Sequence, residues 1–331
     1  MNASSPTAPR SEVGPIAPPI IEGAPIIARN VSKWYGDVVA VSDVSFSVEP
    51  GVTALLGPNG AGKSTMLEML TGLLHPSAGT IEILGKPVRG DESLYSSVGL
   101  VPEQEHIYPF MTGREFLTLN AALQKLPDPE EAAQRALEVV ELVKDGDRPL
   151  RGYSKGMRQR AKIAAAIVHD PQIILMDEPL TGTDPLQRSR MMELIRKLGR
   201  EGKTVLISSH VLDEVERVAD RILVIVNGKL AAAGDFRAIR DKIDEHARGV
   251  RIRAADARGL AGALIQEHTT VAIRLEPGSN GGQPTIIAET ADVRAFYTAV
   301  PAVAQRANIR LYEVSAVDDS LASVFAYVVG R

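Results

Sequence analysis

A glycine-rich segment over residues 57–65 constrains the fold of this chain more than any other feature. The apolar run over 52–56 before it predicts a buried strand, and apolar residues at helical spacing over 66–70 predict a helix after it. A strand, a G-x-x-x-x-G-K-[ST] turn and a helix form the setting in which this pattern indicates a phosphate-binding loop. The loop consists of Gly57, Pro58, Asn59, Gly60, Ala61, Gly62, Lys63, Ser64 and Thr65.

The chemistry expected of this loop follows from its residue types. Glycines let the backbone approach a ligand and point its N–H groups inward, and the positive end of the following helix attracts anions. Lys63 adds a charge that can reach the terminal phosphates, and Ser64 places a hydroxyl where a phosphate-bound Mg²⁺ would sit. The alternative is a glycine-rich turn without a ligand, and the flanking strand and helix argue against it.

Composition limits the remaining possibilities. A length of 331 residues predicts two domains, and a hydrophobic content of 44% with 24% charged residues is typical of a globular protein. The net charge of −4 provides no basic field for nucleic acid, so no nucleic-acid partner is expected. The chain has no cysteine, which excludes disulfides, thiolate metal sites and a cysteine nucleophile. We expect neither a transmembrane helix nor a secretory signal, so work at a membrane would require another chain.

The fold class predicted from the pattern is α/β, followed by a smaller α+β domain. Residues 1–26 carry six of the 21 prolines and predict a disordered tail. Strands are expected over 26–31 and 38–48, with a loop over 32–37 between them, and α/β alternation continues through 234. A mostly helical insertion is expected over about 104–152. After 234 we expect a helix and linker over 235–245, then the order βαββαβα of a ferredoxin-like domain, ending in a helix over 319–329.

Polar residues at strand ends are the further candidates for chemistry. Asp177 and Glu178 follow the apolar run 173–176, where two acids are costly unless they hold Mg²⁺ and accept a proton from water. The alternative is a strand end that runs into solvent. His210 ends the run 204–209, in the region of the ligand crevice of an open α/β sheet, or it is structural.

Three more positions have two interpretations each. Tyr35 is an aromatic residue in a predicted loop, which could stack on a nucleotide base or pack on the surface. Ser154 begins a predicted helix and could cap it or take part in a second anion site. Asp318 and Asp319 could bind a cation, although an acidic helix cap is the commoner meaning.

Taken together, six motifs in order resemble the ATP-binding subunit of an ABC transporter over residues 27–234. The loop over 57–65 resembles the Walker A loop, and 173–177 the Walker B strand with Glu178 after it. Residues 153–157 resemble the signature motif, 181–184 the D-loop and His210 the switch histidine. Tyr35 is at the place of the aromatic A-loop residue, which favours adenine stacking.

The resemblance implies a P-loop NTPase fold of the ABC type, with ATP and Mg²⁺ as cofactors. It implies Glu178 as the general base and His210 as the contact to the γ-phosphate. It implies Ser64, Asp177 and Glu103 around Mg²⁺, with Gln104 as the alternative to Glu103 at the Q-loop position. The implied nucleotide contacts are the nine residues of the loop together with Tyr35, Glu103, Ser154, Gly156 and Asp184.

The resemblance also implies partners. Lys155-Gly156 replaces the usual middle Gly-Gly of the signature, a variant similar to that of exporter subunits that pair with a separate permease. It implies an ATPase that works as a homodimer, in the cytoplasm on the inner face of the cell membrane, with the helical insertion against the permease. Residues 235–331 resemble the small appended domain of multidrug-type exporter ATPases. The alternatives are the ATPase of an importer, a non-transport ABC ATPase and an ATP-dependent switch.

Overall fold

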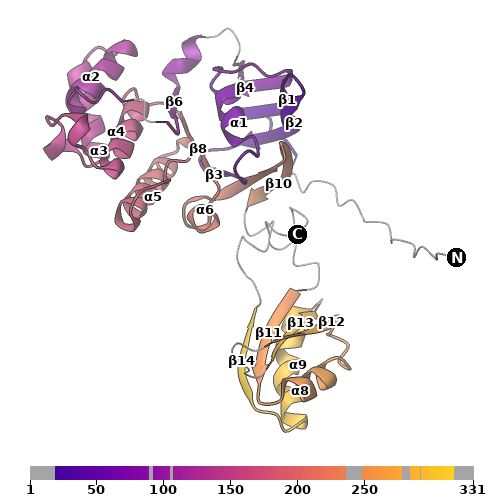
Figure 1. The fold of residues 1–331 in the computed structure, drawn as a ribbon. Helices are drawn as coiled ribbons and strands as arrows, with labels where there is room; N and C mark the ends of the chain where they lie inside the picture. The colour runs from indigo at the N-terminus through magenta and orange to yellow at the C-terminus, as the bar shows by residue number, and fades with distance from the viewer. Residues whose placement is uncertain are drawn as a thin grey trace. The chain divides into compact units, whose positions relative to one another are not determined.

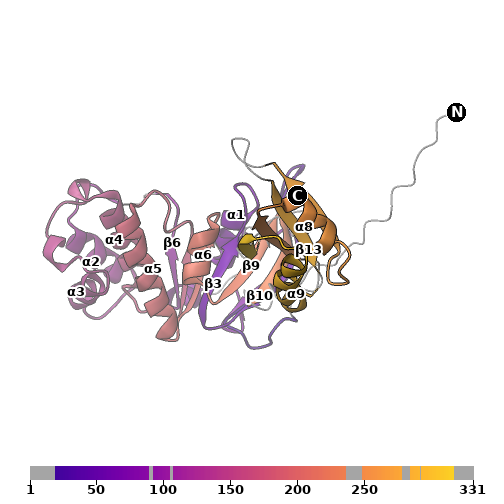
Figure 2. The same cartoon turned by 90° about the horizontal axis from the view of Figure 1, so that it is seen from below.

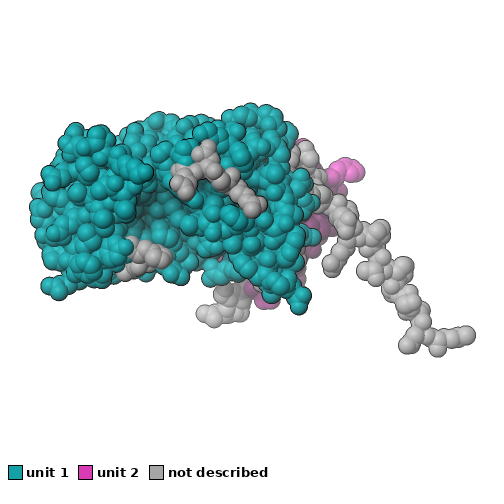
Figure 3. Space-filling view, turned by 90° about the horizontal axis from the view of Figure 1, so that it is seen from above, with its two compact units in different colours: residues 1–236 teal, residues 237–331 magenta. Residues whose placement is uncertain are grey.

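The computed structural model divides the chain into two compact units, Met1–Phe236 and Arg237–Arg331 (Figures 1 and 3). The structure describes residues 19–88, 92–104, 107–235, 248–277, 284–290 and 292–316. Most of the expected tail over 1–26, nearly all of the helix and linker over 235–245, the final helix over 319–329 and the pair Asp318-Asp319 lie outside the described residues. Within the described part of the chain, no helix has the length and apolar character to cross a membrane.

Two sheets form the first unit. The larger sheet has the strand order β10-β9-β3-β8-β7-β6, in which only β10 runs antiparallel to its neighbour. Its strands are β3 (Gly51–Leu56), β6 (Val98–Val101), β7 (Ile173–Met176), β8 (Thr204–Ser209), β9 (Arg221–Val226) and β10 (Lys229–Asp235). The smaller, antiparallel sheet has the order β2-β1-β4-β5, with β1 (Ile26–Tyr35), β2 (Val38–Val48), β4 (Ala78–Ile83) and β5 (Lys86–Pro87).

The helix that follows the glycine-rich loop lies in the core between these sheets. α1 (Lys63–Leu70) buries Met66 and Leu70 in one apolar cluster with Phe46 of the small sheet and with Leu55 and Leu206 of the large sheet. α5 (Pro185–Arg200) and α6 (Leu212–Val218) also contact β3 and β8. Helices therefore cover β3, and this packing of apolar side chains fixes the start of α1 at the carboxyl end of β3.

The structure corrects the expected loop over 32–37. Strand β1 continues to Tyr35, which pairs with Val38 of β2, so only Gly36 and Asp37 form the turn. Three register shifts between Ala28 and Trp34 break the alternation of apolar and polar residues, and that alternation is the signal by which a strand is read from sequence.

A helical segment lies between β6 and β7. It contains α2 (Gly113–Leu123), α3 (Pro129–Val139) and α4 (Lys155–Ile167), with short 3₁₀ turns at Val143–Asp145 and Leu150–Gly152. Another 3₁₀ turn, Glu92–Ser96, precedes β6. Thr112 and Glu115 form a capping box at the start of α2. Figures 1 and 2 both show α2, α3 and α4 gathered at one end of the unit, beyond β6.

The second unit is a four-stranded antiparallel sheet with two helices. Its elements are β11 (Arg248–Ala254), α8 (Ala257–Leu264), β12 (Ala272–Glu276), β13 (Thr285–Thr290), α9 (Val293–Arg306) and β14 (Leu311–Ala316). The sheet order is β12-β13-β11-β14, and Leu260 of α8 and Phe296 of α9 are buried against it. The order β-α-β-β-α-β is that expected for these residues, and the ferredoxin-like assignment stays a prediction.

Candidate active site

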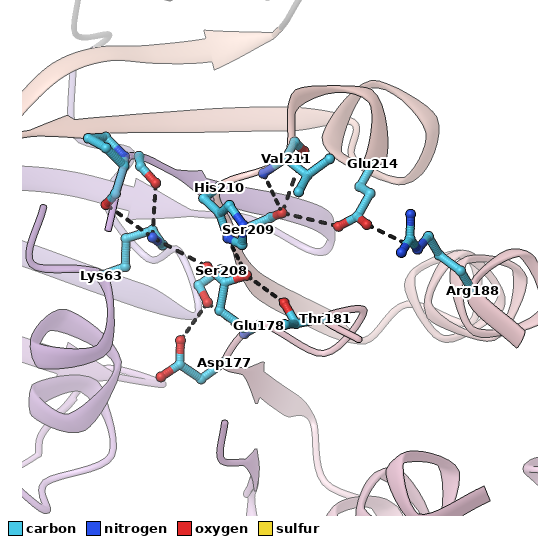
Figure 4. A network of polar contacts seen from close by, with 12 residues as sticks. Lys63, Asp177, Glu178, Thr181, Arg188, Ser208, Ser209, His210, Val211 and Glu214 are labelled. Atoms are coloured by element: carbon cyan, nitrogen blue, oxygen red, sulfur yellow. Dashed lines mark hydrogen bonds and ion pairs between the residues drawn. The ribbon is translucent and has the colours of Figure 1, made fainter. Parts of the chain in front are cut away.

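The candidate residues gather at the carboxyl ends of three adjacent parallel strands (Figure 4). β3 leads into the glycine-rich loop and Lys63, β8 ends just before His210, and β7 ends just before Asp177 and Glu178. In open α/β sheets this edge is the place where ligands bind, because the parallel strands present their following loops there together.

The loop and the start of α1 form a cradle suited to an anion. Gly62 has a φ of 101°, and a Cβ there would collide with the carbonyl oxygen of Ala40, so only glycine fits. No side chain caps α1 and its first turn holds no acid, which leaves the positive helix end free for a phosphate. Lys63 is only 6% exposed, and its Nζ donates to the carbonyl oxygens of Gly57 at 2.9 Å and Pro58 at 3.3 Å.

Glu178 lies between Lys63 and His210. Its Oε2 is 2.9 Å from His210 Nδ1 and accepts a hydrogen bond from Thr181 Oγ1 at 3.1 Å. Its Oε1 is buried without a hydrogen bond and lies 3.3 Å from Lys63 Nζ. The backbone of Glu178 has a φ of 46°, a left-handed conformation that side chains rarely adopt. The surrounding contacts hold this carboxylate in a strained place with one oxygen free of hydrogen bonds.

A buried serine fixes both acidic residues. Ser208 Oγ donates to Asp177 Oδ1 at 2.5 Å and accepts from the backbone N–H of Glu178 at 2.8 Å. The sequence analysis did not assign Ser208 a role. The signal that could have found it is a pair of polar residues, Ser208 and Ser209, at the end of an otherwise apolar strand.

A second buried acid lies behind His210, and it too was not singled out from the sequence. Glu214 of α6 is 5% exposed, and its Oε1 is 3.2 Å from Arg188 Nε. Its Oε2 accepts a hydrogen bond from Ser209 Oγ at 3.3 Å. Burial raises the pKa of Glu214, while Arg188 and Ser209 oppose that rise.

Other predicted residues lie apart from this cluster. Tyr35 is 49% exposed, and the Nζ of Lys33 lies 5.2 Å from its ring centroid. Glu103 is exposed after β6, where its carbonyl oxygen accepts from the buried Lys162 at 3.1 Å. Across the described ranges, no hydrogen bond or ion pair joins Tyr35, Glu103 or Ser154 to Lys63 or Glu178.

Ser154 and Asp184 both cap helices. Ser154 Oγ accepts from Met157 N at 3.2 Å at the start of α4, so the capping interpretation of Ser154 is the one observed. Asp184 accepts from Gln187 N at 2.9 Å at the start of α5. A Cβ on Gly156 would come within 2.8 Å of the Gln187 side chain, so the two helix starts pack together.

The residues present fit a nucleoside triphosphate with a divalent cation. The uncapped helix and Lys63 suit phosphates, and Ser64 and Asp177 supply the oxygen ligands that Mg²⁺ prefers. Among the described residues, no cluster of three or more His, Cys, Asp or Glu could hold a metal alone. The remaining ligands would be phosphate oxygens and water.

Comparisons with known proteins agree with this geometry. A family model described as ABC transporter matches residues 41–181. An ABC transporter ATP-binding protein of Nostoc sp. (strain PCC 7120) is 43% identical over 205 residues, which span 60% of this chain and only 61% of that relative. The Nod factor export ATP-binding protein I of Burkholderia orbicola is 43% identical over 220 residues, which span 65% of this chain and 72% of that protein.

A solved structure extends the agreement to the fold. An ATP-binding cassette in a dimeric post-hydrolysis state, bound to ADP and Pi, is similar with a TM-score of 0.59 and 25% identity. The match covers 64% of this chain and 99% of that cassette. The P-loop fold of the ABC type implied by the sequence is thereby confirmed for the first unit. This chain belongs to the family of ABC transporter ATP-binding proteins.

Proposed function

We propose that this chain hydrolyses ATP with Mg²⁺ at the cluster of Lys63, Glu178 and His210. The observation that carries the proposal is the set of contacts made by the Glu178 carboxylate. Its Oε2 is held by His210 and Thr181, while its buried Oε1 has no hydrogen bond and lies beside the phosphate-loop lysine. A carboxylate held in this way is suited to accept a proton from an attacking water.

The chain's own residues then act by positioning and charge. Lys63 exchanges its contacts with two backbone carbonyls for phosphate oxygens, which the loop N–H groups also bind. Glu178 Oε1 orients water and takes its proton, and His210 holds the other carboxylate oxygen in place. Ser64 and Asp177 would hold Mg²⁺, which would supply positive charge to stabilise the phosphates. Tyr35 would stack on the adenine, and Glu103 would contribute to the Mg²⁺ site.

The site is completed by a second copy of the chain. Ser154, Gly156 and Asp184 lie at two helix starts that pack together, and no hydrogen bond or ion pair in the described part of the chain joins them to Lys63. We assign them to the nucleotide of the partner in a homodimer. The dimeric state named for the similar cassette supports this assignment.

The transport role is that of an exporter subunit bound to a separate permease on the inner face of the cell membrane. The export function in the name of the Burkholderia relative supports this direction. The helical segment offers a surface for the permease, because Phe110 is 76% exposed and its ring centroid lies 6.0 Å from that of the exposed, tilted ring of Tyr108. Exposed aromatic residues are typical of protein interfaces.

The test of hydrolysis is phosphate release by the purified chain. We expect release with ATP and Mg²⁺, and only background release when a chelator removes the metal. Lys63→Ala is expected to lower the rate by about 100-fold, because the phosphates lose the buried positive charge of Lys63. Lys197→Ala removes an exposed lysine of α5 and is the matched control. A Lys63→Ala rate equal to that of the unmodified chain would contradict the proposal.

A further inference from the structure

A closed ring of polar contacts connects Glu178 and His210 to two segments behind them. Figure 4 shows all of these contacts except the one between Arg188 and Thr183. Every step around the ring is a hydrogen bond, an ion pair or a short run of backbone. We call this set the polar ring, and it consists of Glu178, Thr181, Thr183, Arg188, Glu214, Ser209 and His210.

One half of the polar ring holds the segment that carries His210. Glu214 Oε2 accepts from Ser209 Oγ at 3.3 Å, and the same Oγ accepts from the backbone N–H of Val211 at 3.0 Å. The Ser209 hydroxyl therefore links the residues on both sides of His210, because it donates to the buried Glu214 carboxylate and accepts from Val211. The apolar side chain of Val211 cannot cap α6, and Ser209, two residues earlier, accepts from the backbone N–H of Val211 instead.

The other half of the polar ring holds the turn at 181–184. Arg188 Nε lies 3.2 Å from Glu214 Oε1, and its Nη2 donates to the carbonyl oxygen of Thr183 at 3.2 Å. Thr183 is itself buried, and two residues earlier Thr181 donates to Glu178 Oε2 at 3.1 Å. Arg188 thus connects Glu214 to the same turn that contacts the general base.

The outer side of this turn meets the signature segment of the same chain. A Cβ on Gly182 would collide with Nζ of Lys155, and a Cβ on Gly156 would come within 2.8 Å of Gln187 in the first turn of α5. The turn therefore lies between the signature segment and the polar ring. Arg188 directly follows Gln187 in the first turn of α5, so it lies next to the residue that contacts the signature segment.

We propose that Arg188 and Glu214 are positioning residues that couple the signature and D-loop surface to the hydrogen bond between His210 and Glu178. The inference rests on the proposed ATP hydrolysis and adds the residues that hold its base in place.

The burial of Glu214 limits where its charge can go. Glu214 is only 5% exposed, so its carboxylate stays with Ser209 and Arg188, whose Nε is buried although 36% of the Arg188 side chain is exposed. A buried ion pair that only filled space could be replaced by apolar groups of similar volume at little cost. The polar contacts to Thr183 and Ser209 at either end would be lost in that replacement, and these contacts distinguish positioning from packing.

The test compares three variants by kcat and by KM for Mg·ATP. Glu214→Gln removes the charge, Ser209→Ala removes only the hydroxyl, and the double variant Arg188→Met with Glu214→Leu replaces the pair by apolar groups. Each is expected to lower kcat by about 10- to 100-fold, as small misplacements of catalytic groups do, with KM within about twofold. Thermal unfolding of each variant verifies that it is folded.

The control is another arginine–glutamate pair of the first unit. Glu49 and Arg221 lie 2.9 Å apart near the amino ends of β3 and β9, at the opposite edge of the sheet from Glu178. Glu49→Gln removes one charge from this pair, so kcat is expected to stay within about twofold of the unmodified value, the usual outcome for an exposed pair.

The outcomes separate this inference from the proposed function. A folded double variant that regains the unmodified kcat would show that the pair serves packing alone and overturns the inference. An unchanged kcat in Ser209→Ala would overturn it as well, even if Glu214→Gln fails to fold. In both cases the unmodified chain still hydrolyses ATP. An unmodified chain with no hydrolysis would instead remove the proposed function, and the inference with it.

Discussion

At the scale of single residues, Ser208 has the most consequences for the site. Its hydroxyl donates to Asp177 and accepts from the backbone of Glu178, so one group sets the positions of two acids with different proposed tasks. Ser208 is fully buried, and water cannot replace either bond. The strained backbone of Glu178 depends on this acceptor, because its N–H has no other partner in the strand ladder.

Replacing Ser208 by alanine is therefore expected to affect both turnover and stability. We expect Ser208→Ala to lower kcat by about 10-fold or more, since Asp177 and Glu178 are both released from fixed positions. The free energy of unfolding is expected to fall by about 1–3 kcal/mol, the cost of a buried N–H without a partner. Phosphate release and urea unfolding measure the two effects. Ser45→Ala removes an exposed serine hydroxyl that binds Asn30 N, and it serves as the control. Equal kcat values for both variants would contradict this role.

Sequence patterns predicted those site residues that lie within a continuous motif or directly after an apolar strand. Lys63 lies within a continuous motif, and Asp177 and Glu178 follow an apolar strand, so both local chemistry and position were readable. Ser208, Arg188 and Glu214 were not assigned roles, because their partners lie far along the chain or have no fixed spacing. Ser208 contacts residues about 30 positions away, and no periodic pattern in the sequence indicates such a contact.

At the scale of elements, α4 and β6 are joined by a histidine. His169, just after the end of α4, binds the carbonyl oxygen of Val98 through Nε2 at 3.2 Å. Its Nδ1 is buried without a hydrogen bond. Burial lowers the pKa of His169, because the neutral ring suits this place and a second proton would have no acceptor.

This contact makes the stability of the first unit depend on pH. As the pH falls, His169 binds a proton at about pH 6.5 in the unfolded chain. The pKa of His169 is lower in the folded chain, so the folded chain binds this proton only at lower pH. The free energy of unfolding is therefore expected to fall as the pH drops below about 6.5, by at most about 1.4 kcal/mol per pH unit. Urea unfolding between pH 7.5 and 5.5 measures it, with the single tryptophan, Trp34, as the reporter in β1.

The histidine variants decide whether His169 is the cause. His169→Gln is expected to flatten this part of the pH dependence, whereas His75→Gln, which changes an exposed histidine, is expected to keep it. A slope that is the same in all three proteins would contradict the assignment to His169.

The boundaries of elements are clearest in the sequence where one local signal dominates. The capping box of α2 and the turn at Asn227-Gly228, where both φ angles are positive, follow directly from short residue patterns. The predicted end of the first strand was wrong, because the bulges of β1 remove the alternation that marks a strand. Pairing with β2 holds the rest of β1 in place. Tertiary pairing overrides the local pattern there.

At the scale of the whole molecule, the chain carries one phosphate loop and one signature segment. In the described residues the two are not joined by a hydrogen bond, and the proposed function assigns them to two copies of the chain. The resemblance of the sequence to a family implies this pairing, which stays a prediction although the family is confirmed. The composition could not predict it, because an interface between copies leaves no periodic pattern in one chain.

ATP-dependent pairing is the prediction at this scale. Equilibrium sedimentation of Glu178→Gln is expected to show a monomer without nucleotide and a dimer with ATP at micromolar protein. Gly156→Arg, added to that variant, is expected to prevent the dimer while ATP still binds, because a side chain at Gly156 collides with Gln187 and alters the signature surface.

The matched control places the same side chain in open space. A Cβ on Gly262 of α8 meets nothing within 4 Å, so Gly262→Arg is expected to leave the dimer intact. A monomer in the presence of ATP without either arginine substitution would count against the homodimer.

Glu178 is proposed to act as the base of an ATP hydrolysis site. The most direct measurement is the rate of phosphate release by Glu178→Gln, with the Kd for ATP measured on the same preparation. The amide keeps the shape but cannot take a proton, so the rate is expected to fall by about 100-fold or more. The Kd is expected to stay within about threefold, because Lys63 and the loop bind the phosphates. A rate equal to that of the unmodified chain, at equal ATP binding, would contradict the account.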